Sequence, residues 1–486
     1  MADITGTEGP DTLDGTEDAD TISGLGGNDT LNGLGGDDTL NGGPGVDSVN
    51  GGAGNDTIVM AEPPEIGFGP GGLIFETIDG GADFDTIELR PFADPALIFN
   101  DVSGYGLFNV TITGIEHIHL ASTALVDVAA LIDLSQVNAG ITQVTGGAGR
   151  DSLLTFVKVA GTYTVPSLTL VDWTNSSTPH LTGDLVGLSV NGPGDYTLNA
   201  LEGLASAQYL SGSIGNDTLN GSSGSEILDG GGGVNVLNGN GGDDLLAVTN
   251  ANDFFGNPTT YTGAGSTFDG GAGFDLLSIG GIVNFQGTLT GIEGIYLQPA
   301  FESPAANNGL DRPEAHLTVT DSLLDTLPAD LELQGTGTIT VDMARGDVFD
   351  GSGFVHAAGS AVQFVVNGTR WSDTITGTSG DDELNGERGH DTLTGGAGDD
   401  TLTGGAGHDT FVIRAGDGDD TITDMELGRA AGDVIDFAGV FASFAEVLGA
   451  ASQVAADVVI AIDAGTHLTL AGHTVAEMHA NDFLFA

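Results

Sequence analysis

One nine-residue pattern recurs six times without interruption near the start of the chain. It reads G-G-x-G-x-D-x-U-x, where U is a large aliphatic residue, and its fullest copy is GGPGVDSVN from Gly42. Every copy holds an aspartate at the sixth position and an aliphatic residue at the eighth, and the copies begin at Gly6, Gly15, Gly24, Gly33, Gly42 and Gly51. Glycine permits tight turns, the aliphatic residue supplies a thin core and the aspartate supplies charge. The repeat therefore constrains both the fold and the metal chemistry.

The pattern returns in two further arrays and in three single copies. The second array starts at Gly212 and is looser, with Asp217, Glu226, Asn235 and Asp244 at its sixth positions. The third starts at Gly368 and regains an aspartate in every copy, and a last copy after a two-residue slip adds Asp420. Single copies begin at Gly80, Gly146 and Gly270. The intervening segments alternate short runs of Thr, Val, Leu and Ile with turn residues, which predicts strands.

Two nonapeptides form one coil of a flattened parallel β-roll, so residues eighteen apart should stack on one edge. The first array then has one row of Asp11, Asp29 and Asp47 and an opposite row of Asp20, Asp38 and Asp56. The third array has rows of Asp373, Asp391 and Asp409 and of Asp382 and Asp400. The slip leaves the edge of Asp420 open.

Such rows cannot form unaided. Stacked strands lie roughly 4.8 Å apart, where two carboxylates repel by about 1 kcal/mol in water and about 3 kcal/mol at a surface-like dielectric. One buried aliphatic side chain per repeat offsets only about 1.5–3 kcal/mol, less than the cost of ordering nine residues. A hard cation with flexible oxygen coordination supplies the missing stabilisation, and calcium suits carboxylates plus carbonyls better than magnesium does. The candidate calcium ligands are Asp11, Asp20, Asp29, Asp38, Asp47, Asp56, Asp85, Asp151, Asp217, Asp244, Asp275, Asp373, Asp382, Asp391, Asp400, Asp409 and Asp420.

The charge balance limits the partners. With 69 acidic and 9 basic residues the formal net charge is −60, which repels nucleic acid and anionic membranes. A halophile's solvated acidic surface is the alternative, but it would not place Asp every nine residues. There are no cysteines, so disulfides and thiolate sites are excluded. The first residues lack a basic region and an apolar run, so no secretory signal peptide and no membrane insertion are expected.

The repeat resembles that of the RTX (repeats-in-toxin, haemolysin-type calcium-binding) family. The resemblance implies multiple calcium ions, held between successive turns by the sixth-position aspartates and by glycine-turn carbonyls. It also implies type I secretion without an N-terminal signal peptide, and folding outside the cell. The tail, with Phe441–Val454 at helical spacing, two strands and a final DFLFA, resembles the family's C-terminal secretion signal. It could also serve as a cap on the last roll.

We therefore predict an all-β fold, a parallel β-roll or β-solenoid with β-rich segments between arrays and a short C-terminal helix-plus-strand cap. The expected parts are an N-terminal roll at 1–60, a β-rich module at 61–211, a degenerate array at 212–278, a β-rich segment at 279–367, a C-terminal roll at 368–424 and a cap with the secretion signal at 425–486. Helix is expected only near 125–134, near 320–327 and at Phe441–Val454. The sequence leaves open whether the β-rich segments continue the solenoid.

No catalytic motif stands out. The sequence contains neither H-E-x-x-H nor G-x-S-x-G, so neither a serralysin-type protease nor a lipase elbow is indicated. His117 and His119 share a strand face and are best interpreted as ordinary strand residues. The favoured function is a secreted, calcium-dependent structural protein that self-assembles, as RTX-type surface-layer proteins do. The alternatives are an extracellular adhesin that binds a glycan or cell-surface polysaccharide, and a polysaccharide-acting enzyme.

Overall fold

A computed structural model describes the chain except for residues 62–65, 70–71, 92–101, 108–109, 124–126, 138–139, 148–150, 158–160, 166–167, 172–184, 191–193, 205–206, 250–263, 281, 299–314, 345–347, 429–431 and 486. The chain divides into two units, one of Met1–Gly230 with Leu237–Asp244 and one of Gly231–Val236 with Leu245–Ala486. Among the described residues, no helix is long and apolar enough to span a membrane.

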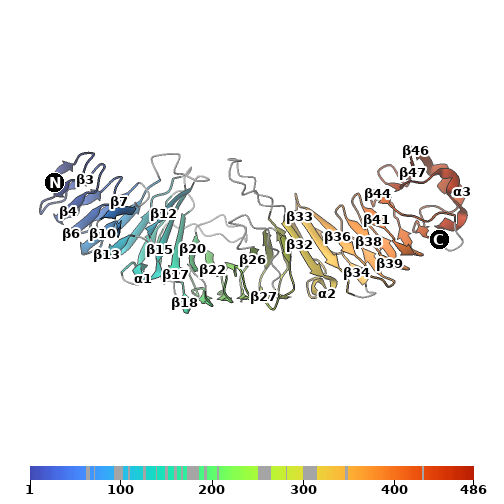
Figure 1. Cartoon of the computed structure of the whole chain (residues 1–486), viewed down its shortest axis with the longest axis horizontal. Coiled ribbons are helices and arrows are strands. Elements are labelled where there is room, and N and C mark those ends of the chain that lie inside the picture. Colours follow the sequence, from blue (N-terminus) through green and yellow to red (C-terminus); the bar gives the residue numbers. More distant parts are fainter. Residues whose placement is uncertain are drawn as a thin grey trace. The chain divides into compact units, whose positions relative to one another are not determined.

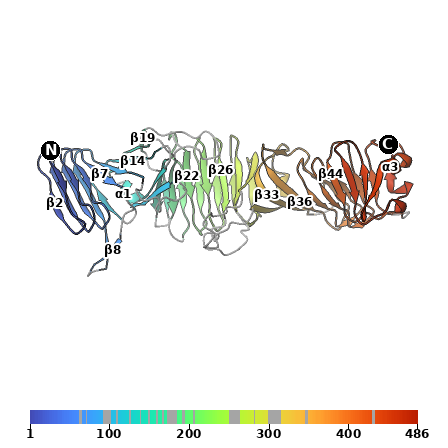
Figure 2. The ribbon, with the colours of Figure 1, turned by 90° about the horizontal axis from the view of Figure 1, so that it is seen from above.

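The first array forms two parallel ladders of short strands, seen in blue in Figures 1 and 2. Residue Thr12 pairs with Thr30 and Thr21 pairs with Thr39, so the eighteen-residue register is confirmed. One ladder contains β1 (Asp3–Thr5), β3 (Thr21–Ser23), β5 (Thr39–Asn41), β7 (Thr57–Met60), β11 (Thr86–Leu89), β14 (His117–Leu120), β16 (Gln143–Thr145) and β19 (Thr169–Val171). The other contains β2 (Thr12–Asp14), β4 (Thr30–Gly35), β6 (Ser48–Ala53), β10 (Thr77–Ala82) and β13 (Thr111–Thr113).

The β-rich segment that follows continues the parallel pairing. Its strands β12 (Val102–Gly106), β15 (Asp127–Asp133), β17 (Asp151–Val157), β20 (Leu185–Val190) and β22 (Ala207–Ser211) form one ladder, which β24 (Glu226–Asp229) of the second array continues. Strands β18 (Thr162–Thr164) and β21 (Thr197–Asn199) lie in a separate sheet with β23 (Thr218–Asn220) and β25 (Val236–Asn238) of the second array. A hairpin of β8 (Ile66–Gly69) and β9 (Gly72–Phe75) lies outside these ladders. The helix expected near 125–134 is wrong: in the part of this range that the structure describes, residues 127–133 form β15, and helix α1 (Leu134–Val137) begins at the last position.

The second unit uses the same parallel pairing in two main ladders. One contains β26 (Leu245–Thr249), β28 (Leu276–Gly280), β29 (Ile282–Asn284), β31 (Gly294–Leu297), β32 (Ala315–Thr320), β33 (Glu332–Asp342), β35 (Val355–His356), β36 (Ala361–Asn367), β38 (Glu383–Asn385), β41 (Thr401–Thr403) and β44 (Asp419–Ile422). The other contains β34 (Val348–Asp350), β37 (Thr374–Thr376), β40 (Thr392–Thr394), β43 (Thr410–Val412), β45 (Val434–Asp436) and β49 (Phe483–Leu484). Strand β27 (Thr267–Asp269) also pairs in parallel with β30 (Thr288–Thr290), and β39 (Arg388–Gly389) forms a two-stranded sheet with β42 (Ala406–Gly407). The helix expected near 320–327 is α2 (Asp321–Leu324).

The core of each roll is one side chain deep. Eighth-position residues such as Leu31, Leu40, Leu384 and Leu402 are fully buried. They stack on their counterparts one coil away, because register joins Leu31 to Val49 and Leu384 to Leu402. The sixth-position aspartates lie at the two edges of this narrow core.

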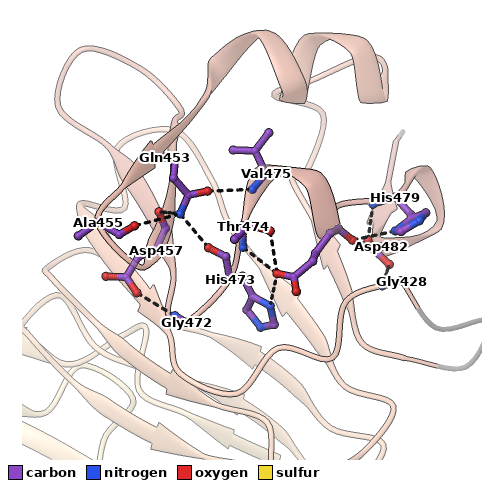
Figure 3. A network of polar contacts seen from close by, with 11 residues as sticks. Gly428, Gln453, Ala455, Asp457, Gly472, His473, Thr474, Val475, His479 and Asp482 are labelled. Atoms are coloured by element: carbon purple, nitrogen blue, oxygen red, sulfur yellow. Dashed lines mark hydrogen bonds and ion pairs between the residues drawn. The ribbon is translucent and has the colours of Figure 1, made fainter.

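The tail folds onto the last coil. Helix α3 (Phe444–Ala450) is shorter than expected, because residues 451–454 form β46 (Ala451–Val454), which pairs antiparallel with β47 (Asp457–Ala461) and through it with β48 (His467–Leu470). Two 3₁₀ turns follow, Val475–Glu477 and Ala480–Asp482. Buried Asp482 accepts the backbone N–H of Gly428 (2.8 Å) and of His479 (2.6 Å), as Figure 3 shows. The tail is thereby fixed to the chain that leaves the last repeat.

Candidate metal centre

The sixth-position aspartate of each repeat lies between the glycine turn and the strand. Sixteen of the seventeen candidate aspartates are buried, and Asp11 is half-buried. Among the described residues no group of three or more His, Asp or Glu side chains converges on one point. A cation at these edges would therefore meet at most two of these side chains at one point.

The aspartates stack in rows through their Oδ1 atoms. The backbone N–H of Asp11 donates to Oδ1 of Asp29 (2.8 Å), and that of Asp29 donates to Oδ1 of Asp47 (2.9 Å). The opposite row joins Asp20, Asp38, Asp56 and Asp85 in the same way, at 2.7–2.8 Å. In the third array the bonds join Asp373, Asp391 and Asp409 in one row and Asp382, Asp400 and Asp420 in the other. The single copy at Gly80 thus extends the first array, and the open question of Asp420 is answered: it lies on the edge of Asp382 and Asp400.

The second carboxylate oxygen has no hydrogen-bond donor in seven of these buried side chains. They are Asp29, Asp38, Asp56, Asp85, Asp391, Asp400 and Asp409. A buried carboxylate oxygen without a partner is costly. Burial also raises the pKa of the Asp391 carboxyl to about 6, of Asp420 to about 7 and of Asp400 to about 8. The metal-free edge therefore disfavours the charges that the sequence places there.

The first glycine of the repeat lies close to Oδ2 of the sixth-position aspartate, and the space between them is too small for a side chain. A Cβ built on Gly33 would lie 2.3 Å from Oδ2 of Asp38 and 2.3 Å from the carbonyl oxygen of Gly51. A Cβ on Gly51 would meet Oδ2 of Asp56 and the carbonyl oxygen of Gly80, both at 2.4 Å. Carboxylate and carbonyl oxygens thus converge where glycine is required. This donor set fits calcium, which accepts many oxygen ligands in flexible geometry.

The remaining candidates differ in their surroundings. Asp151 lies beside Ser122, whose hydroxyl donates to its Oδ2 (3.1 Å), as does the backbone N–H of Gly147 (2.6 Å). Asp244 accepts the N–H of Glu226 (2.7 Å), and both side chains are buried. Asp275 is fully buried at the first turn of its single copy. Five others, Asp11, Asp20, Asp217, Asp373 and Asp382, receive donors from their own turns.

Three carboxylates that continue the rows escape the sequence pattern. Glu116 accepts the N–H of Asp85 (3.0 Å), Glu293 accepts that of Asp275 (2.8 Å), and Asp433 accepts that of Asp409 (2.9 Å). A signal existed for the two glutamates, because both lie in a recurring Gly-Ile-Glu tripeptide after a single repeat copy. Asp433 follows an irregular spacing of 24 residues and carries no such signal.

The fold and these rows define a parallel β-roll whose edges present carboxylate and carbonyl oxygens, the atoms that calcium binds. The sequence matches the family description "RTX calcium-binding nonapeptide repeat (4 copies)" over residues 5–40, 23–58, 202–237, 211–246, 220–255 and 372–411. The chain therefore carries calcium-binding RTX repeats in several copies, and multiple calcium ions are its cofactor.

Other comparisons add little. No curated protein matches the chain. Among solved structures, the crystal structure of the extracellular lipase LipA from Serratia marcescens is similar at 17% identity and a TM-score of 0.20. The match covers 74% of this chain and 45% of that one, so the chain spans less than half the length of this relative. A similarity this low carries no argument about activity.

Proposed function

We propose that the protein is secreted, folds when calcium binds its repeats outside the cell, and serves as a self-assembling structural protein. The observation that carries the proposal is the row of buried carboxylate oxygens without donors at the edges of two arrays. Such edges are unfavourable without a cation, and cytosolic calcium is too low to supply one. The sixth-position aspartates whose second oxygen lacks a donor are the proposed ligands, together with the carbonyls that face the first glycines.

Two features support a structural role over a catalytic one. Calcium repeats occur from Gly6 to Thr423 and alternate with strands that continue the same parallel pairing. A single lysine and a net charge of −60 describe a surface that repels its own copies until cations neutralise it. Calcium would then promote both folding and association.

A calcium titration followed by circular dichroism and light scattering tests both parts. We expect β-structure to appear cooperatively with calcium and scattering to rise at or above the same concentration. Asp391→Asn should shift the folding midpoint to higher calcium, whereas the matched change of exposed Asp325, Asp325→Asn, should not. Equal effects would refute the ligand assignment, and dispersed monomers at millimolar calcium would refute assembly.

A groove in the second unit favours an adhesin as the second candidate. It has a volume of about 490 Å³ and is lined by polar groups that include Asn284, Gln286, Thr318, Ser322 and Asp342. Amides, hydroxyls and a carboxylate in a shallow groove suit sugar hydroxyls. Binding on a glycan array that Asp342→Ala abolishes, while the calcium-induced dichroism stays intact, would support this candidate.

A further inference from the structure

The second residue of the repeat divides the copies into two kinds of turn. In the first two copies of each array this residue is a threonine or a serine. The six positions are Thr7, Thr16, Ser213, Ser222, Thr369 and Thr378. In later copies it is Gly, Leu, Asn or Glu.

In the hydroxyl copies the turn satisfies its own carboxylate. The backbone N–H of Thr378 donates to Oδ2 of Asp382 (2.6 Å), its hydroxyl donates to the same oxygen (3.0 Å), and the N–H of Gly380 donates to that hydroxyl (3.1 Å). The second-position N–H reaches the carboxylate in all six copies. The second-position hydroxyl donates to the carboxylate in five copies, all but that of Ser213. In all six copies this hydroxyl also accepts the backbone N–H of the fourth residue.

In four later copies the second residue is left-handed, and the second carboxylate oxygen of the aspartate receives neither of these donors. The φ angle is 78° at Leu25, 76° at Leu34, 70° at Glu387 and 116° at Gly396. Three of these residues carry side chains that ordinarily avoid this conformation, so the turn imposes it. The aspartates of these four copies, Asp29, Asp38, Asp391 and Asp400, all have an Oδ2 without a donor.

The hydroxyl turn also relaxes the need for glycine. Its fourth position is Asp18 in one copy and Trp371 in another. In the left-handed copies the fourth position is commonly a glycine at positive φ, such as Gly27 at 120° and Gly398 at 121°. The two turns therefore treat the second oxygen of the edge carboxylate differently: the hydroxyl turn donates hydrogen bonds to it, and the left-handed turn does not.

We infer that the second residue decides whether a repeat takes calcium, and that the hydroxyl copies are calcium-independent caps at the start of each array. A cation at Asp382 would have to displace two donors that already hold its Oδ2. A cation at Oδ2 of Asp400 displaces no hydrogen-bond donor. The inference rests on calcium binding by the left-handed copies, as proposed above, and it removes Asp11, Asp20, Asp217, Asp373 and Asp382 from the ligand set.

The calcium content of refolded, calcium-saturated full-length protein tests the inference, counted by native mass spectrometry. Asp400→Asn should lose about one ion per chain, whereas Asp382→Asn should keep the wild-type count. If Asp382→Asn loses as much as Asp400→Asn, the caps bind calcium and the inference is overturned while the ligand assignment stands. If neither variant loses calcium, both fail.

A converse experiment guards against misfolding of these variants. Thr378→Gly turns the copy from Gly377 into G-G-S-G-D-D, the left-handed pattern, and should gain about one ion per chain. Thr378→Val removes the same hydroxyl, including its 3.1 Å contact with Nε2 of His356, but cannot adopt that turn. It should keep the wild-type count and melt at lower temperature. A Thr378→Gly protein with no additional calcium, or a Thr378→Val protein with more, would overturn the inference.

Discussion

Substitution of Gly33 by alanine tests the calcium edge where the geometry is tightest. The backbone of Gly33 is not left-handed, so alanine is conformationally allowed there. Its Cβ, however, would lie 2.3 Å from both Oδ2 of Asp38 and the carbonyl oxygen of Gly51. Overpacking of this kind costs about 1–3 kcal/mol. A lost calcium site costs about 2.7 kcal/mol more at a calcium concentration one hundred times its Kd.

The two contributions separate in a calcium series. The free energy of unfolding is measured by urea denaturation at several calcium concentrations, and each bound ion adds about 1.4 kcal/mol per tenfold increase in calcium. We expect Gly33→Ala to reduce the slope of unfolding free energy against calcium by about 1.4 kcal/mol per tenfold increase, the contribution of one bound ion. Gly9→Ala is the matched control, because only one atom lies within 4.0 Å of its Cβ. If Gly33→Ala leaves the dependence of the unfolding free energy on calcium unchanged, the substitution acts by steric strain alone. Oδ2 of Asp38 and the carbonyl oxygen of Gly51 would then not form a calcium site.

Three further predictions follow from burial and charge. Without calcium, the folded roll holds carboxyl pKa values of about 6 to 8 at Asp391 and Asp400 against an ordinary 3.8. The folded form therefore binds more protons than the unfolded chain in this window, so metal-free β-structure should weaken as the pH rises from 5.5 to 8 in circular dichroism with chelator. Leu402→Ala should cost about 2–5 kcal/mol of calcium-loaded stability in urea denaturation, because Leu402 is fully buried between Leu384 and Ile422; a loss below 0.5 kcal/mol would contradict a packed core. Asp482→Ala should leave two N–H groups without an acceptor, and limited proteolysis should then release the tail first; an unchanged cleavage pattern would refute this.

The repeat determines much of the fold in advance because its period fixes register. Residues eighteen apart do pair, and the eighth-position side chains do form the core. The helix expected near 125–134 fails for a physical reason. Val128, Ala130 and Ile132 are all fully buried, which is the period of a strand, and parallel pairing with β12 and β17 overrides the helix-forming residues between them.

The edges are harder to predict where a loop interrupts the repeat. Asp85 and Glu116 are 31 residues apart, yet Thr86 pairs with His117 and so brings the two carboxyl groups onto one edge. Asp420 joins Asp400 because the two extra residues are absorbed before Thr421, which pairs with Thr401. Spacing alone does not show where a chain absorbs extra residues, since that depends on which strand it next pairs with.

In one copy of the second array an asparagine side chain completes the turn, which lowers the expected calcium requirement of this array. Its Asn235 replaces the aspartate, and its Nδ2 lies 3.4 Å from the carbonyl oxygen of Gly231 and 3.3 Å from that of Gly232. The side-chain amide of Asn235 donates to carbonyl oxygens that would otherwise bind a cation, and this neutral side chain adds no charge repulsion to the row. We therefore expect residues 212–238 to need less calcium than residues 24–59 or 386–412. Hydrogen exchange measured along a calcium titration should show protection of residues 212–238 at lower calcium than the other two segments. Simultaneous protection of all three would mean that the arrays fold as one cooperative unit, whatever completes their turns.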